Sequence, residues 1–129
     1  MTPVFSLAVV AGVALGGGLG AVVRLMLDRW LPFGVLAANT LGCLLLGWLF
    51  GELSAPESRA SATTGLFSEP VMTVLVFGVI GALSTFATVS VRVAQLWIAR
   101  ERLRAAGMWL LNVTCGFAAA AAGIALSGL

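Results

Sequence analysis

Residues 71–99 read VMTVLVFGVIGALSTFATVSVRVAQLWIA, a run of 29 residues with a single charged side chain, Arg92. As one straight α-helix this run would be about 43 Å long at 1.5 Å per residue, whereas the hydrocarbon core of a bilayer is about 30 Å thick. Tilt could absorb part of the excess. Alternatively, the helix breaks where Gly78 and Gly81 weaken it and hydroxyls such as that of Ser84 can bond freed backbone groups. Small residues also let two helices pack closely, so this stretch by itself leaves break and packing open.

The composition of the whole chain is that of a small integral membrane protein. Of the 129 residues, 60% are hydrophobic and 9% are charged, against about 25% charged residues in an ordinary soluble domain. The mean hydropathy is +1.10. These values exclude a disordered chain, a nucleic-acid-binding protein and a soluble enzyme domain. All seven basic residues are arginines and histidine is absent, so acid–base and metal chemistry has few residues to use, and we expect no enzyme.

Besides residues 71–91, three charge-free runs, residues 1–23, 30–51 and 105–129, are long enough to cross a membrane, since a span needs about 20 apolar residues. In lipid the backbone must satisfy its own polar groups, which restricts the spans to helices or a closed barrel. The absence of strict alternation favours helices. We therefore predict an all-α integral membrane protein that forms a single domain over residues 1–129. Its four transmembrane helices are expected at about residues 4–27, 32–52, 71–99 and 105–127.

The arginines are divided unequally between the two sides of the membrane. With four spans, both termini and residues 52–70 lie on one side, which carries a single arginine, Arg59. The other side carries four loop arginines: Arg29, Arg100, Arg102 and Arg104. Because arginine-rich loops stay in the cytoplasm, we expect both termini to lie outside the cell membrane and the first and third loops to lie inside it.

The charges closest to the hydrocarbon are cationic. None of the four runs contains Asp or Glu. A proton-coupled exporter needs a carboxylate inside the membrane that takes up and releases protons, so this function is disfavoured. Arg24 lies near the end of the first helix and Arg92 lies in the second half of the third. Charges inside a membrane point to function, and their sign favours an anion. The alternative is that each long side chain reaches a membrane surface, particularly Arg24, which is close to Asp28.

Uncharged polar residues also occur within the spans, namely Asn39 in the second and Asn112 and Thr114 in the fourth. An amide in lipid must find a partner, so hydrogen bonding between helices is the ordinary interpretation. The alternative is that these side chains line a narrow hydrated path. Asn112 and Thr114 lie about 200° apart around a helix, so they cannot both face one path.

Three stretches, in order along the chain, resemble the motifs of one protein family. GGGLGAVVR (residues 16–24) is similar to its first-helix pattern, which ends in arginine. AANTLGCLLLG (residues 37–47) is similar to its second-helix pattern, and GVIGALSTFATVS (residues 78–90) resembles its broken third helix. These motifs belong to the Fluc (CrcB) fluoride channels of microbes, and the match covers most of the chain.

The resemblance implies an antiparallel assembly of two subunits, with narrow fluoride-selective pores at the interface that let toxic fluoride leave the cell passively. It implies that the third helix is broken in mid-membrane and that four residues contact or attract the anion: Asn39, Phe86, Thr88 and Arg24. It also implies that backbone carbonyls of Gly81 and Ser84 hold a structural sodium ion at the dimer centre. The positive edge of an aromatic ring suits a channel, because it receives an anion without binding it too tightly.

The chain departs from the family pattern at three positions. Val89 stands where the second phenylalanine of a pair is expected, Ser84 replaces a threonine, and Arg92 replaces an acidic or polar residue. Together with the unequal arginines, Val89 suggests a heterodimer in which a paralogous subunit of opposite orientation supplies the missing ring. A self-sufficient antiparallel homodimer is the alternative. A non-conducting structural membrane protein and a small-molecule exporter are further alternatives.

Overall fold

The computed structural model describes residues 6–54 and 68–128. The prediction that the first helix begins near residue 4, and the contribution of Arg59 to the charge balance, lie outside the described residues. Within the described ranges every regular element is a helix. In chain order these are α1 (Leu7–Trp30), α2 (Gly34–Ser54), α4 (Glu69–Thr73), the π-helix η1 (Val74–Ile80), α5 (Gly81–Leu83), α6 (Phe86–Ile98) and α7 (Arg102–Leu126).

In the part of the chain that the structure describes, four helical stretches are long and apolar enough to cross a membrane: Leu7–Trp30, Gly34–Ser54, Glu69–Ile98 and Arg102–Leu126. The prediction of an all-helical membrane protein with four spans is therefore confirmed. The first helix runs three residues beyond the expected residue 27 and includes Asp28 and Arg29. These charged residues are compatible with a helix. The helix ends before Pro32, because a proline disfavours helical backbone at the residue that precedes it, and Leu31 is extended at φ −111° and ψ 137°.

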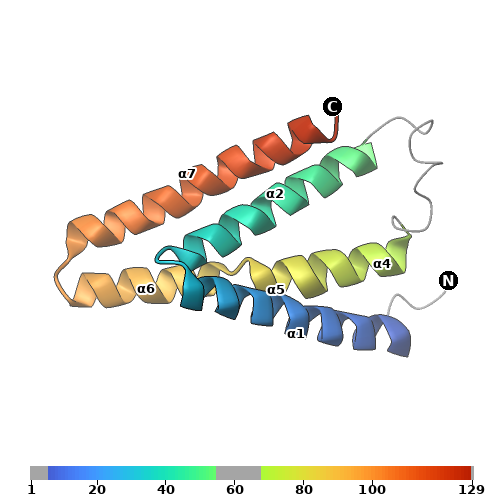
Figure 1. The fold of residues 1–129 in the computed structure, drawn as a ribbon, viewed down its shortest axis with the longest axis horizontal. Coiled ribbons are helices and arrows are strands. Elements are labelled where there is room, and N and C mark those ends of the chain that lie inside the picture. The colour runs from blue at the N-terminus through green and yellow to red at the C-terminus, as the bar shows by residue number, and fades with distance from the viewer. Residues whose placement is uncertain (1–5, 55–67, 129) are drawn as a thin grey trace.

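The second span is the central helix of the subunit (Figure 1). α2 lies between α7 on one side and the third span on the other, and α1 packs against the third span from the far side. In the most apolar 18-residue window of each helix, 44% of the residues of α2 are buried, compared with 6% of those of α1. Most of the surface of α1 is therefore left for lipid or for another subunit.

Glycines bring the helix backbones close together. Gly12, Gly16 and Gly20 lie at four-residue intervals on α1 and face the third span, where a Cβ at Gly16 would come 3.2 Å from the Val79 methyl carbon Cγ2. A Cβ at Gly20 would overlap the carbonyl oxygen of Val79. Helices in lipid associate largely through such close packing, because the apolar solvent provides no hydrophobic driving force between them.

The third span changes its helical geometry twice. The sequence pattern did not predict η1, in which the wider π-type turns replace the α-helix over seven residues. The chain then returns to the α-helix in α5 and leaves it at Ser84 and Thr85, which are extended at ψ 114° and 119°. α6 begins immediately afterwards at Phe86. Two extended residues thus interrupt the helical path between α5 and α6.

A tight turn joins α6 to α7. Arg100 has a φ of 62°, its N–H donates to the Trp97 carbonyl, and the N–H of Glu101 donates to the Leu96 carbonyl. This pair of bonds is the Schellman arrangement that closes many helices, usually with glycine at the left-handed position. An arginine takes that position here, so the turn adds a cation to the end of the molecule that carries the first and third loops.

Candidate functional site

Asn39 holds the extended residues of the third span. Its side-chain oxygen accepts a hydrogen bond of 2.9 Å from the backbone N–H of Thr85. The Asn39 side chain is buried, with 9% of its surface exposed, and a buried N–H without a partner would cost about 1–3 kcal/mol. A residue of α2, 46 positions away in the sequence, therefore provides the hydrogen bond that the helix no longer provides at Thr85.

Asn112 of α7 extends this contact into a chain of hydrogen bonds. Asn39 Nδ2 donates to Asn112 Oδ1 at 3.1 Å, and Asn112 Nδ2 donates to the carbonyl oxygen of Met108 at 2.9 Å. The interpretation of these amides as partners between helices is confirmed. Thr114 instead turns to its own helix and donates to the Leu110 carbonyl at 2.8 Å. The two asparagines thus connect α2, α7 and the third span by hydrogen bonds.

Residues at the start of α6 lie in contrasting environments. The ring of Phe86 is 68% exposed, whereas Val89, one turn later, is 1% exposed and belongs to the core of the subunit. Thr88 is half-buried. Residue 89 of this chain therefore lies in the core of the subunit. Phe86, in the same turn of α6, places an aromatic ring on the surface of the subunit.

The interruption also leaves helix ends of opposite polarity facing one another. α5 ends at Leu83, and α6 begins at Phe86 with no side-chain cap from Thr85. A helix start presents N–H groups with partial positive charge, and a helix end presents carbonyl groups with partial negative charge. Gly81 is exposed and Ser84 is half-buried. Carbonyl oxygens at this end are suited to a hard cation, and N–H groups at the start of α6 are suited to an anion.

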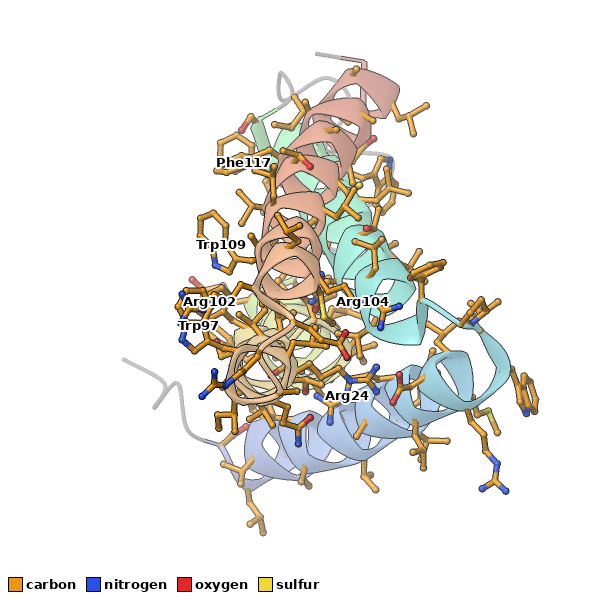
Figure 2. The ribbon with its side chains drawn as sticks, turned by 90° about the vertical axis from the view of Figure 1, so that its left-hand side faces the viewer. Arg24, Trp97, Arg102, Arg104, Trp109 and Phe117 are labelled. Carbon is orange, nitrogen blue, oxygen red and sulfur yellow. The ribbon has the colours of Figure 1, made fainter. Side chains whose placement is uncertain are left out.

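Arg24 and Arg92 have different surroundings. Arg92 Nη2 donates to both carboxylate oxygens of Asp28, at 2.7 and 2.6 Å, and so links α6 to the end of α1. Arg24 is half-buried on the side of α1 that faces the other helices (Figure 2). It forms no ion pair within residues 6–54 and 68–128. The acid close to Arg24 in the sequence is therefore paired with the arginine of the third span.

A cavity of about 1000 Å³ opens between the start of α2, α6 and the start of α7. Its apolar walls include Phe33 and Leu36, and its polar lining residues are Arg92, Gln95, Arg104 and Asn112. Because Asn112 is bonded to Asn39, the cavity reaches the hydrogen-bond chain that ends at the interruption of the third span. The cavity thus extends from the arginine-rich end of the molecule to Asn112 of α7.

Figure 2 looks onto this arginine-rich end. Arg104 lies on the side of α7 that faces α2, whereas Trp109 and Phe117 project from the opposite side. Arg102 lies over the ring of Trp97, with 5.1 Å between the guanidinium carbon and the ring centroid. Only part of the basic surface is therefore directed towards the cavity, and the rest faces outward next to aromatic side chains of the kind that settle at membrane interfaces.

The sequence and the family resemblance selected Asn39, Phe86, Thr88 and Arg24 as candidate site residues, and their roles stay predictions. They did not identify two partners that the structure shows. They did not connect Asn112 with Asn39, although both are amides in apolar spans that need a donor or acceptor. They also did not connect Asp28 with Arg92, although Arg92 is the one charge within residues 71–99. A polar group within an apolar span needs a hydrogen-bond or ion-pair partner, and this need is visible in the sequence. The sequence does not show which partner the fold supplies.

Comparisons with known proteins agree with one another. The family profile described as "CrcB-like protein, Camphor Resistance (CrcB)" matches residues 11–124. A protein of Hahella chejuensis named "Fluoride-specific ion channel FluC" is 35% identical over 126 residues, which cover 91% of this chain and 92% of that protein. A Rhizobium etli protein of the same name is 32% identical over 123 residues, covering 88% and 91% of the two chains. "Fluoride-specific ion channel FluC 1" of Geobacillus kaustophilus is 30% identical over 111 residues, covering 81% and 84%.

Proposed function

Because the chain belongs to the family of CrcB-like proteins, we propose that it is a subunit of a fluoride-selective ion channel that lets fluoride leave the cell passively. Membership confirms the resemblance drawn from the three sequence motifs, and the relatives are named as channels rather than enzymes. The observation that carries the proposal is the bond from Thr85 to Asn39. It stabilises extended backbone beside an exposed phenylalanine at the start of α6.

Four residues provide the anion path in this proposal. Asn39 Nδ2 carries two hydrogens and donates one to Asn112, so a second N–H remains for fluoride. The edge of the exposed Phe86 ring receives the ion weakly, and the Thr88 hydroxyl replaces part of its hydration shell. Arg24 raises the local anion concentration. Weak contacts in series permit conduction, since an ion must both bind and leave.

A structural sodium ion fits the carbonyl groups at the end of α5. Gly81 and Ser84 would hold it through backbone oxygens, which are hard donors. No group of three or more His, Cys, Asp or Glu residues that could hold a metal lies in the described ranges. When bound, the ion would supply positive charge that ties together two helix ends. Replacing sodium with an organic cation should lower the thermal stability of the purified protein, which can be measured without any flux.

We propose that a second subunit covers Phe86, which is 68% exposed in the single chain. We propose an antiparallel pair in the plasma or inner membrane, with both termini of this chain outside. A heterodimer with a paralogue is favoured by the loop arginines at one end and by Val89, which is in the core and offers no ring to the subunit surface. A homodimer would need the chain to insert in both orientations.

Fluoride efflux from liposomes that contain the purified chain tests the proposal, with a fluoride electrode as the readout and chloride efflux as the control. Rapid fluoride release without chloride release is expected from a self-sufficient channel. Release only after co-expression with a paralogue would establish the heterodimer. Silence in both preparations would overturn the channel assignment and leave a structural membrane protein. Drug resistance conferred on a sensitive host would instead point to a small-molecule exporter.

A further inference from the structure

The two arginines that line the cavity are each paired with a carboxylate, but the pairs differ in burial. Arg104 contacts Glu101 at 2.7 Å, one turn away on the same helix, and its side chain is 78% exposed. Arg92 contacts Asp28 at 2.6 Å, with the two side chains 39% and 30% exposed. Exposed pairs contribute little and are screened by salt, so the Arg92 pair is the better-defined charge at this cavity.

The geometry of the Arg92 pair places the cation in front of its partner. Arg92 and Gln95 line the cavity, whereas Asp28 does not. One guanidinium nitrogen, Nη2, contacts both carboxylate oxygens, so the other N–H groups of the guanidinium remain for other partners. The pair is thus a dipole whose positive end faces the cavity that reaches Asn112.

We propose that Arg92, held in position by Asp28, sets the rate at which anions enter the pore from this cavity. The inference rests on the proposed function and adds to it the ion pair that controls the rate of anion entry. A cation that lines a mouth with low-dielectric walls concentrates anions there. Asp28 offsets part of that charge and occupies one nitrogen of the guanidinium. The anion is consequently attracted but not trapped, which conduction requires.

A charge-sensitive labelling experiment measures the field of the cavity without any flux. Gln95→Cys, in a chain whose native cysteines are replaced (Cys43→Ala and Cys115→Ala), places a thiol in the cavity. Its rates of reaction with a negatively and a positively charged thiosulfonate reagent are compared. A unit charge about 7 Å away changes each rate about threefold in water. Arg92→Gln should therefore lower the ratio of anionic to cationic reaction about tenfold, and Asp28→Asn should raise it.

A charge swap separates this role from a merely structural one. Asp28→Arg with Arg92→Asp keeps an ion pair between α1 and α6 but turns its negative end towards the cavity. The swap should restore thermal stability lost in Arg92→Gln and yet keep the low labelling ratio. Arg29→Gln is the matched control, because it removes a cation from the same end of the molecule, outside the residues that line the cavity. It should change the ratio much less.

Fluoride efflux at low ionic strength completes the test. Arg92→Gln should slow efflux about threefold at low fluoride, and the difference should shrink as salt is raised. An unchanged labelling ratio in Arg92→Gln, or recovery of efflux in the swapped protein, would overturn the inference while the channel stands. Absence of efflux from the unmodified chain, alone and with a paralogue, would overturn the proposed function itself, whatever the labelling ratio.

Discussion

The two halves of the third span are held in place by different interactions. The first half, η1 and α5, packs its apolar surface against the glycines of α1, and shape decides that contact. The second half, α6, is tied by polar groups, through Thr85 to Asn39 and through Arg92 to Asp28. A closely packed contact is disrupted by any added atom, whereas a hydrogen bond or ion pair is lost when one of its two partners is removed. The comparison teaches that α6, although it also packs against α7 and buries Val89, depends on a few individual hydrogen bonds for its position.

The largest effect is expected where α1 meets η1. Gly20→Ala places a Cβ against the Val79 carbonyl oxygen, and neither backbone can move without separating the helices. We expect the subunit to lose about 4 kcal/mol of stability, measured by denaturation in detergent. Gly18→Ala is the matched control, since a Cβ there would meet no atom within 4 Å. Because alanine favours the helix more than glycine does, Gly18→Ala should not destabilise the subunit, and equal losses in the two variants would show that the contact with the Val79 carbonyl is not what makes Gly20 necessary.

A second test enlarges the buried residue of α6. Val89→Phe adds the ring that the family pattern leads one to expect, but it does so at a side chain that is 1% exposed. Overpacking should cost about 3 kcal/mol, detected as a lower melting temperature of the purified subunit. A stable variant that gains fluoride efflux would instead mean that α6 rotates and presents residue 89 to the pore.

Removal of the polar tie should have a somewhat smaller effect on stability. Asn39→Ala leaves the Thr85 N–H and the Asn112 oxygen without the partner they have now, at a cost of about 2 kcal/mol. Asn112→Ala breaks the bond to Asn39 but keeps the bond between Asn39 and Thr85, so about half the loss is expected. Amide hydrogen exchange at Thr85 is the direct readout, and it should accelerate in Asn39→Ala more than in Asn112→Ala.

The smallest effect on stability, but not on transport, is expected from the exposed ring. Phe86→Ala and Phe77→Ala remove rings that are 68% and 72% exposed, one from each half of the third span. Each should change subunit stability by about 0.5 kcal/mol or less. Fluoride efflux should fall in Phe86→Ala alone. Comparable efflux from both variants would remove Phe86 from the proposed anion path and leave the two halves equivalent.

Several features of the site could be predicted and others could not. Asn39 and Arg92 could be selected from the sequence, because a polar group in an apolar run is costly and its type is visible. Their partners could not be selected. Asn112 is 73 positions from Asn39 and Asp28 is 64 positions from Arg92, and such pairs depend on how four helices are arranged around one another. The π-type turns of η1 likewise leave no clear mark among apolar residues that suit either helix.

The sequence by itself determined that this protein is a four-span helical membrane protein with cationic side chains near one end. In lipid every backbone polar group must be bonded within the protein, which leaves helices or a closed barrel, and long apolar runs without strict alternation favour helices. Only the tertiary structure decided which polar groups meet, that residue 89 belongs to the core, and that Arg92 faces a cavity while Asp28 lies behind it. The physical reason is that hydropathy depends on composition along the chain, whereas pairing and burial depend on distances between helices that composition does not specify.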